Sequence, residues 1–181
     1  MNFNDWTLKA IREEGSHFSW MEEFRFNWIP QVQNAIKQIL EGQSVIIITD
    51  RDFKWYSDYI IDRTNQIWKN RPFFPIYPID GVFANAYSLE DANELDFLYD
   101  MLDISFANGY FFWYIGSGKH KHYDFIEQDK NSLIWHLNKD VEGLFSLNKK
   151  DPHIDIKLIQ AYKLFDKALD SAFIGEIEFW K

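Results

Sequence analysis

The sequence predicts an α/β protein built as a three-layer doubly wound parallel sheet with helices on both faces. Residues Val45 to Ile48 form an unbroken aliphatic run without the polar alternation of a half-solvated strand, so both faces of this strand are expected to be covered. Segments with helical periodicity alternate with such buried strands, which is the order of a parallel sheet. No internal repeat or linker is visible, and we therefore expect a single domain over residues 1–181.

Two helices are expected first. Asn4 or Asp5 caps a short helix, because both side chains can accept hydrogen bonds from free amides of the first turn. A longer helix spans roughly Ser19 to Glu41, where Ser19 and Glu22 have the spacing of a capping box. Its apolar positions recur on one stripe, which should face the sheet.

Pro30 lies inside this second helix. Proline removes an amide donor and clashes with the preceding turn, so we expect a kink or break near residues 27–29. The central strand follows, and then a helix from Phe53 to Trp68 with a broad apolar face. The segment Pro72 to Ile79 is β-prone but carries three prolines, so it is expected at the edge of the sheet.

The second half of the chain continues the alternation. Ser88 caps a helix from Leu89 to Leu102 whose exposed side is strongly acidic. Buried strands are predicted at Tyr110 to Ile115 and Ser132 to Leu137, and a long final helix runs from Pro152 to about Ile174.

The composition excludes several classes of function. The net charge of −9 repels phosphate backbones, and no basic patch overrides it, so direct nucleic-acid binding is not expected. Cysteine is absent, which excludes disulfides and thiolate chemistry and fits a cytoplasmic protein. No run is long enough to span a membrane. Aromatic residues make up 19% of the chain, more than one core of this size requires, which indicates an oligomer or a protein partner.

The charged exit of the central strand is the first candidate site. Asp50, Arg51 and Asp52 follow the strand directly, and doubly wound sheets place ligand and partner surfaces at this edge. The triplet can be read as a catalytic carboxylate pair, a solvated helix start or a recognition surface. A solvated loop does not shift the pKa of a carboxylate as catalysis requires. We assign partner binding to this exit and to the aromatic Phe53 and Trp55 beyond it.

Two further segments could hold small ligands. The loop Gly116-Ser117-Gly118 follows a strand and could cradle a phosphate, although it lacks the full spacing of a phosphate-binding motif. His120 and His122 could chelate a metal from an extended segment, although lysines flank them. We assign no catalytic, cofactor-binding or metal-binding residue.

Two surface features suit a protein partner. The acidic face of the third major helix, with Glu90 and Glu94, is a solvated face or a surface for a basic partner. Phe173 and Ile174, beside Gly175, belong to the core, to an oligomer interface or to an apolar anchor for another protein. We include all four as candidate partner-binding residues.

Several motifs resemble one known family. They include Asp5-Trp6, Trp20-Met21-Glu22, the strand ending in Asp50, Arg71-Pro72, Phe112-Trp113 and, above all, the segment from Asp155 to Leu169 (DIKLIQAYKLFDKAL). The chain resembles the HobA family, regulators of chromosomal replication initiation in epsilonproteobacteria and functional counterparts of DiaA, from about Phe3 to Phe179.

The resemblance implies a Rossmann-like fold similar to sugar isomerase (SIS) domains, a homotetramer, and direct binding of the N-terminal domain of the initiator DnaA. SIS proteins hold a sugar phosphate with a Gly/Ser-rich loop after the first strand, but here residues 49–54 read TDRDFK. We therefore expect a non-enzymatic adaptor that gathers DnaA at the chromosomal origin without a cofactor. The alternatives are a sugar-phosphate-binding or isomerising SIS enzyme that uses the loop at residues 116–118, and direct DNA binding.

Overall fold

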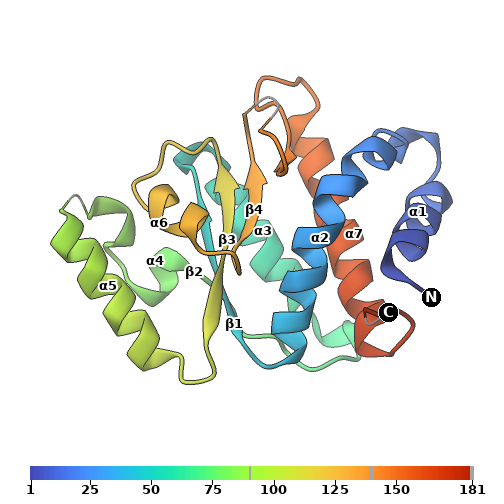
Figure 1. Cartoon of the computed structure of the whole chain (residues 1–181). Coiled ribbons are helices and arrows are strands. Elements are labelled where there is room, and N and C mark those ends of the chain that lie inside the picture. The colour runs from blue at the N-terminus through green and yellow to red at the C-terminus, as the bar shows by residue number, and fades with distance from the viewer. Residues whose placement is uncertain (90, 139–140, 180–181) are drawn as a thin grey trace.

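The protein is built around a five-stranded parallel sheet (Figure 1). The computed structural model describes residues 1–89, 91–138 and 141–179. The strands of this sheet are β1 (Ser44–Thr49), β2 (Ile76–Pro78), β3 (Tyr110–Gly116), β4 (Leu133–His136) and β5 (Phe145–Ser146). Their order is β2-β1-β3-β4-β5, and every neighbouring pair is parallel. The predicted fold class is therefore confirmed.

Helices cover both faces of the sheet (Figure 1). One face carries α1 (Phe3–Glu13), α2 (Met21–Leu40), α3 (Lys54–Thr64) and α7 (Ile154–Phe173). The other carries α4 (Ile79–Val82), α5 (Ala92–Ser105) and α6 (Tyr123–Gln128). Short 3-10 turns lie at η1 (Ser16–Phe18), η2 (Arg51–Phe53), η3 (Ile67–Lys69) and η4 (Ala86–Ser88).

Side-chain alternation along the strands builds two cores. Val45 and Ile47 of β1 pack with α2, α3 and α7, whereas Ile46 and Ile48 pack with α5 and α6. This follows from the period of two along a strand, and it explains why residues 45–48 of β1 are all apolar. On β3 and β4, Trp113 and Trp135 meet edge to face with ring centroids 5.0 Å apart and fill the larger core.

The expected break in the second helix is wrong. α2 runs without interruption from Met21 to Leu40 with Pro30 inside it. Pro30 is exposed, so water can reach the carbonyl that has lost its amide partner, and the helix tolerates the loss.

Three predicted helix caps are also wrong. Asn2, rather than Asn4 or Asp5, caps α1 by accepting from the amide of Asp5. The Ser19 hydroxyl donates backward to the carbonyl of Ser16 instead of capping α2. Ser88 lies in η4, and Asp91 caps α5 in a capping box with Glu94. For α1 and α5 another polar residue within a few positions provides the cap, and spacing alone could not choose between them. Helix α2 follows Trp20 and has no side-chain cap.

Arg71 connects the loop before β2 to helix α7 through ion pairs. Its side chain is 4% exposed and its guanidinium pairs with Asp166 and Asp170 of α7, with 2.6 Å between Nη2 and Asp166 Oδ1. Nη2 also donates to the carbonyl of Thr64 at 2.7 Å. β2 itself is the edge strand predicted from its prolines.

Candidate functional site

The candidate site lies where β1 and β3 end side by side. Helices leave these two strands toward opposite faces of the sheet, and ligands of doubly wound sheets bind in the crevice at this switch point. Thr49 lies opposite Ile115 in the register of the two strands. The sequence therefore brings the charged exit at Asp50 next to the glycine loop at residues 116–118.

Asp50 accepts three hydrogen bonds at this crevice. Its Oδ2 accepts from the backbone N–H and the hydroxyl of Ser117, at 2.8 and 2.7 Å, and its Oδ1 accepts from the hydroxyl of Tyr114 at 3.0 Å. Burial, followed by the charge of Asp50, raises the pKa of Tyr114, which therefore stays a donor. The chain's own carboxylate thus occupies the donors that a bound anion would use.

Three further backbone amides of the crevice are also engaged. The amide of Thr49 donates to the hydroxyl of Tyr87 at 3.2 Å, and the amide of Asp50 donates to the carbonyl of Ile115 at 3.1 Å. The amide of Gly118 donates to the hydroxyl of Tyr114 at 3.1 Å. These bonds hold both loops in place and leave the described site poorly suited to phosphate.

Gly116 is required by this arrangement. A Cβ built on it would lie 2.3 Å from Oδ1 of Asp50 and 2.4 Å from the hydroxyl oxygen of Tyr114. Neither atom can withdraw without losing a hydrogen bond, so the close approach of Asp50 depends on a residue without a side chain. The glycine loop that could suggest phosphate binding serves here to admit a carboxylate.

Histidines line the same edge without forming a metal site. The rings of His120 and His122 stack with centroids 4.9 Å apart. His122 uses both nitrogens, Nδ1 with the hydroxyl of Tyr99 at 2.9 Å and Nε2 with the carbonyl of Ala86 at 3.0 Å. Burial lowers the pKa of His120 to about 4, and it also lowers the pKa of His122. Within the described residues, no group of three potential ligands is arranged to hold a metal ion.

The strand exit divides into buried and exposed residues. Asp50 is half-buried and Phe53 is buried in the larger core, so both support the loop from within. Arg51 and Asp52 are exposed, and Trp55 is 38% exposed beside them. From the sequence we expect the loop at residues 50–52 to be solvated. For Asp50 this is wrong, because its carboxylate accepts hydrogen bonds from Tyr114 and Ser117 and is half-buried. Neither partner is recognised from the sequence, since both lie more than 60 residues away.

The remaining candidates lie at opposite edges of the sheet. α5 begins near the carboxyl ends of the strands, as does the exit of β1, whereas α7 ends near their amino ends (Figure 1). Glu94 is therefore on the same side of the molecule as Asp52, and Phe173 and Ile174 are on the far side. Phe173 is 43% and Ile174 67% exposed. Glu90 lies outside the described residues.

Comparisons with known proteins agree over nearly the whole chain. A family model described as HobA, DNA replication regulator, matches residues 1–179. The DNA replication regulator protein HobA of Helicobacter pylori is 25% identical in an alignment 182 residues long, gaps included. The alignment covers 97% of this chain and 98% of that protein.

Two solved structures share the fold. A chain in the crystal structure of a HobA–DnaA (domain I–II) complex from Helicobacter pylori is 25% identical and superposes with a TM-score of 0.73, covering 98% of this chain and 99% of that one. A crystal structure of HobA from the same organism is 21% identical with a TM-score of 0.71 and the same coverage. No helix in the described part of the chain has the length and apolarity that a membrane crossing requires.

Proposed function

The chain belongs to the HobA family of DNA replication regulators, as its motifs predict, and we propose that it is a non-enzymatic adaptor that binds the N-terminal region of DnaA. The structural relative at 25% identity is a HobA–DnaA (domain I–II) complex, which supports DnaA as the partner. We further propose that the chain forms one domain, acts in the cytoplasm as a homotetramer, and promotes DnaA assembly at the chromosomal origin. Several docking sites on one assembly raise the effective concentration of a partner without any covalent chemistry.

One observation carries the non-enzymatic part of this proposal. The carboxylate of Asp50 accepts from Tyr114 and Ser117 at the crevice where a sugar phosphate would bind. A phosphate entering there would have to displace a negative charge from three donors and would be repelled by it. The alternative of a sugar-phosphate isomerase is therefore disfavoured by the geometry of the site itself.

We propose that partner contacts at the carboxyl edge come from the exposed residues Arg51, Asp52 and Trp55 and from Glu94 in the first turn of α5. From its place in the sequence alone, we also assign Glu90 to the partner contacts. Asp50 and Phe53 would act by holding this loop in shape. Phe173 and Ile174 at the opposite edge would form a separate contact, made to a second DnaA molecule or to a neighbouring protomer. The two groups lie at opposite edges of the sheet, so they can be tested separately.

The test is binding of purified DnaA domain I–II to immobilised protein. We expect the wild type to bind, Asp52→Lys and Trp55→Ala to bind roughly tenfold more weakly, and Asp62→Lys to bind like the wild type. Asp62 is a suitable control because it is exposed on the neighbouring helix α3 and its reversal changes the net charge equally. The double change of Phe173 and Ile174 to serine tests the opposite edge.

Two results would contradict the proposal. If the wild-type protein does not bind DnaA domain I–II, the proposed adaptor function is wrong. Calorimetric titration that detects tight binding of a sugar phosphate would restore the enzymatic alternative. Light scattering on the wild type and on each variant tests the tetramer, and the carboxyl-edge variants should leave its mass unchanged.

A further inference from the structure

A groove on the α5 side of the sheet has an aromatic floor and an acidic rim. It lies at the amino end of β3, between the end of α5 and the face of α6, and encloses about 470 Å³. We name it the α5 groove. The residues that define it are Asp103, Phe106, Tyr110, Phe112, Phe125 and Asp129.

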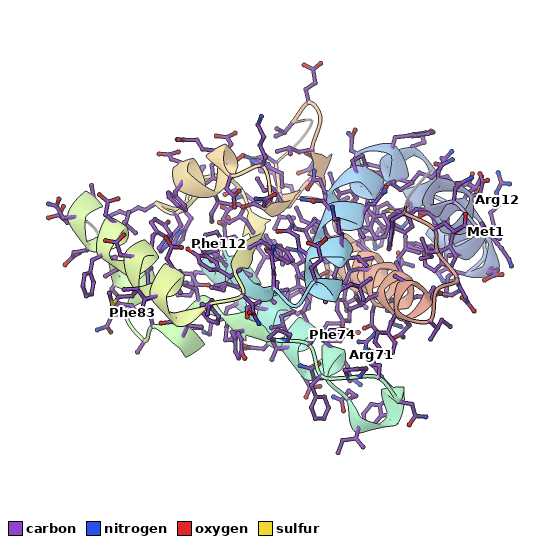
Figure 2. All side chains as sticks on the ribbon, turned by 60° about the horizontal axis from the view of Figure 1, so that its bottom comes forward. Met1, Arg12, Arg71, Phe74, Phe83 and Phe112 are labelled. Carbon is purple, nitrogen blue, oxygen red and sulfur yellow. The ribbon has the colours of Figure 1, made fainter. Side chains whose placement is uncertain are left out.

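The rings of the α5 groove form a continuous series. Phe106 and Tyr110 have centroids 5.8 Å apart, and Tyr110 meets Phe112 edge to face at 5.4 Å. Phe112 meets Phe125 edge to face at 6.3 Å, and Phe125 stacks on Tyr99 at 3.7 Å. Phe125 remains 44% exposed, so an incoming side chain can reach it. Phe112, labelled in Figure 2, lies on β3 in the middle of the series, between Tyr110 and Phe125.

The helices beside the groove carry charge of one sign. Helices α5 (Ala92–Ser105) and α6 (Tyr123–Gln128) contain no lysine or arginine. Asp103 lines the groove and accepts from the hydroxyl of Tyr110 at 3.0 Å. The acidic residues of the two helices are Glu94, Asp96, Asp100, Asp103, Asp124 and Glu127.

Two large apolar side chains are also exposed on α5. Phe97 is 56% and Ile104 74% exposed, and because they are seven positions apart they lie on one face of the helix. Asp100 falls between them on that face. Large exposed apolar residues among like charges are typical of a surface that another protein covers.

We propose that the α5 groove receives an arginine or lysine from an amphipathic, basic segment of a protein partner. The aromatic faces suit a cation, and Asp103 can pair with it at the rim. The flanking Phe97 and Ile104 would cover the apolar residues of the same segment. A symmetric contact with a second copy of this chain is disfavoured, because two acidic faces would meet. Nucleic acid and anionic membranes are repelled by the same negative charge.

This inference rests on the proposed function, since we assign the basic segment to DnaA domain I–II. The test measures binding of that fragment to wild type, Asp103→Asn, Asp103→Lys and Glu142→Lys. Asparagine keeps an acceptor for Tyr110 and so removes the charge without disturbing the groove. Glu142 is an exposed loop residue, and its reversal matches the net-charge change of Asp103→Lys.

We expect Asp103→Lys to weaken binding by at least roughly tenfold, Asp103→Asn to weaken it less, and Glu142→Lys to change it by less than about twofold. Added salt should weaken the wild type more than Asp103→Lys. Each lysine and arginine of the fragment is then changed to glutamate in turn, and one of these variants should bind Asp103→Lys better than it binds the wild type.

The outcomes separate the two proposals. Wild-type binding that neither Asp103 variant weakens would overturn the groove assignment and leave the adaptor function standing. A wild type that does not bind the fragment would overturn the proposed function and the groove assignment with it. Thermal unfolding of each variant checks that lost binding does not reflect lost folding.

Discussion

Replacing Asp50 by alanine should destabilise the protein by about 3 kcal/mol. The carboxylate accepts from the hydroxyl of Tyr114 and from the amide and hydroxyl of Ser117, at 2.7 to 3.0 Å. A hydrogen bond to a charged group contributes about 1.5–3 kcal/mol, so three independent, fully buried bonds would contribute roughly 5–9 kcal/mol. Asp50 is only half-buried, and water can satisfy some of the released donors, which reduces the expected loss to about a third or a half of that range.

Thermal unfolding followed by circular dichroism is the assay. In a chain of 181 residues, 1 kcal/mol shifts the midpoint by about 2–4 °C, so Asp50→Ala should unfold about 6–12 °C below the wild type. Asp50→Asn keeps an acceptor oxygen but not the charge and should fall between the two. The matched control is Asp52→Ala, which removes an exposed carboxylate two positions away and should change stability by less than about 0.5 kcal/mol.

Equal midpoints for Asp50→Ala and Asp52→Ala would refute the reasoning, because the carboxylate would then not be holding the two loops together. The crevice would have to be maintained by its other contacts. An Asp50 that contributes nothing to stability could move aside, and a phosphate could then bind in the crevice.

Two other perturbations test the electrostatics of the fold. Arg71→Met should cost about 3 kcal/mol in urea-induced unfolding, because it leaves Asp166 and Asp170 without their buried guanidinium partner, and a loss below about 1 kcal/mol would contradict this. Stability should fall as pH decreases from about 6.5 to about 4, because burial lowers the pKa of His120 to about 4 and the unfolded chain takes up the proton first. His120→Gln should flatten part of this slope, measured as urea midpoints between pH 4 and 7, and an unchanged slope would show that His120 does not contribute.

The sequence predicts the fold where a segment carries its own signal. The unbroken aliphatic run of β1 and the aromatic run of β3 identify both central strands, and the prolines beside β2 predict its position at the sheet edge. β5, two residues long, is missed because it has no pattern of its own and exists through its pairing with β4. Helix α6 is missed for a similar reason, since six residues are too few to show a helical period.

The candidate site is predictable in position but not in chemistry. A charged segment after a central strand indicates the switch point, and the structure confirms that Asp50 lies there. The sequence does not show that its carboxylate accepts hydrogen bonds from Tyr114 and Ser117, because only the register of β1 and β3 brings these residues together. The α5 groove is still less visible in the sequence, because its rings come from three segments and Phe125 lies in a helix that the pattern does not reveal.

The two edges of the sheet divide the surface into regions of different chemistry. At the carboxyl edge, Asp50 accepts the hydrogen bonds that Tyr114 and Ser117 can donate, and Arg51, Asp52 and Trp55 remain exposed. At the amino edge, the α5 groove offers aromatic faces and the carboxylate of Asp103, which suit a basic side chain far better than a phosphate. Both regions therefore favour recognition of a protein over binding of an anion, and they do so by independent means. A variant set that tests Asp52 and Asp103 separately would show whether the proposed partner contacts one edge of the sheet or both.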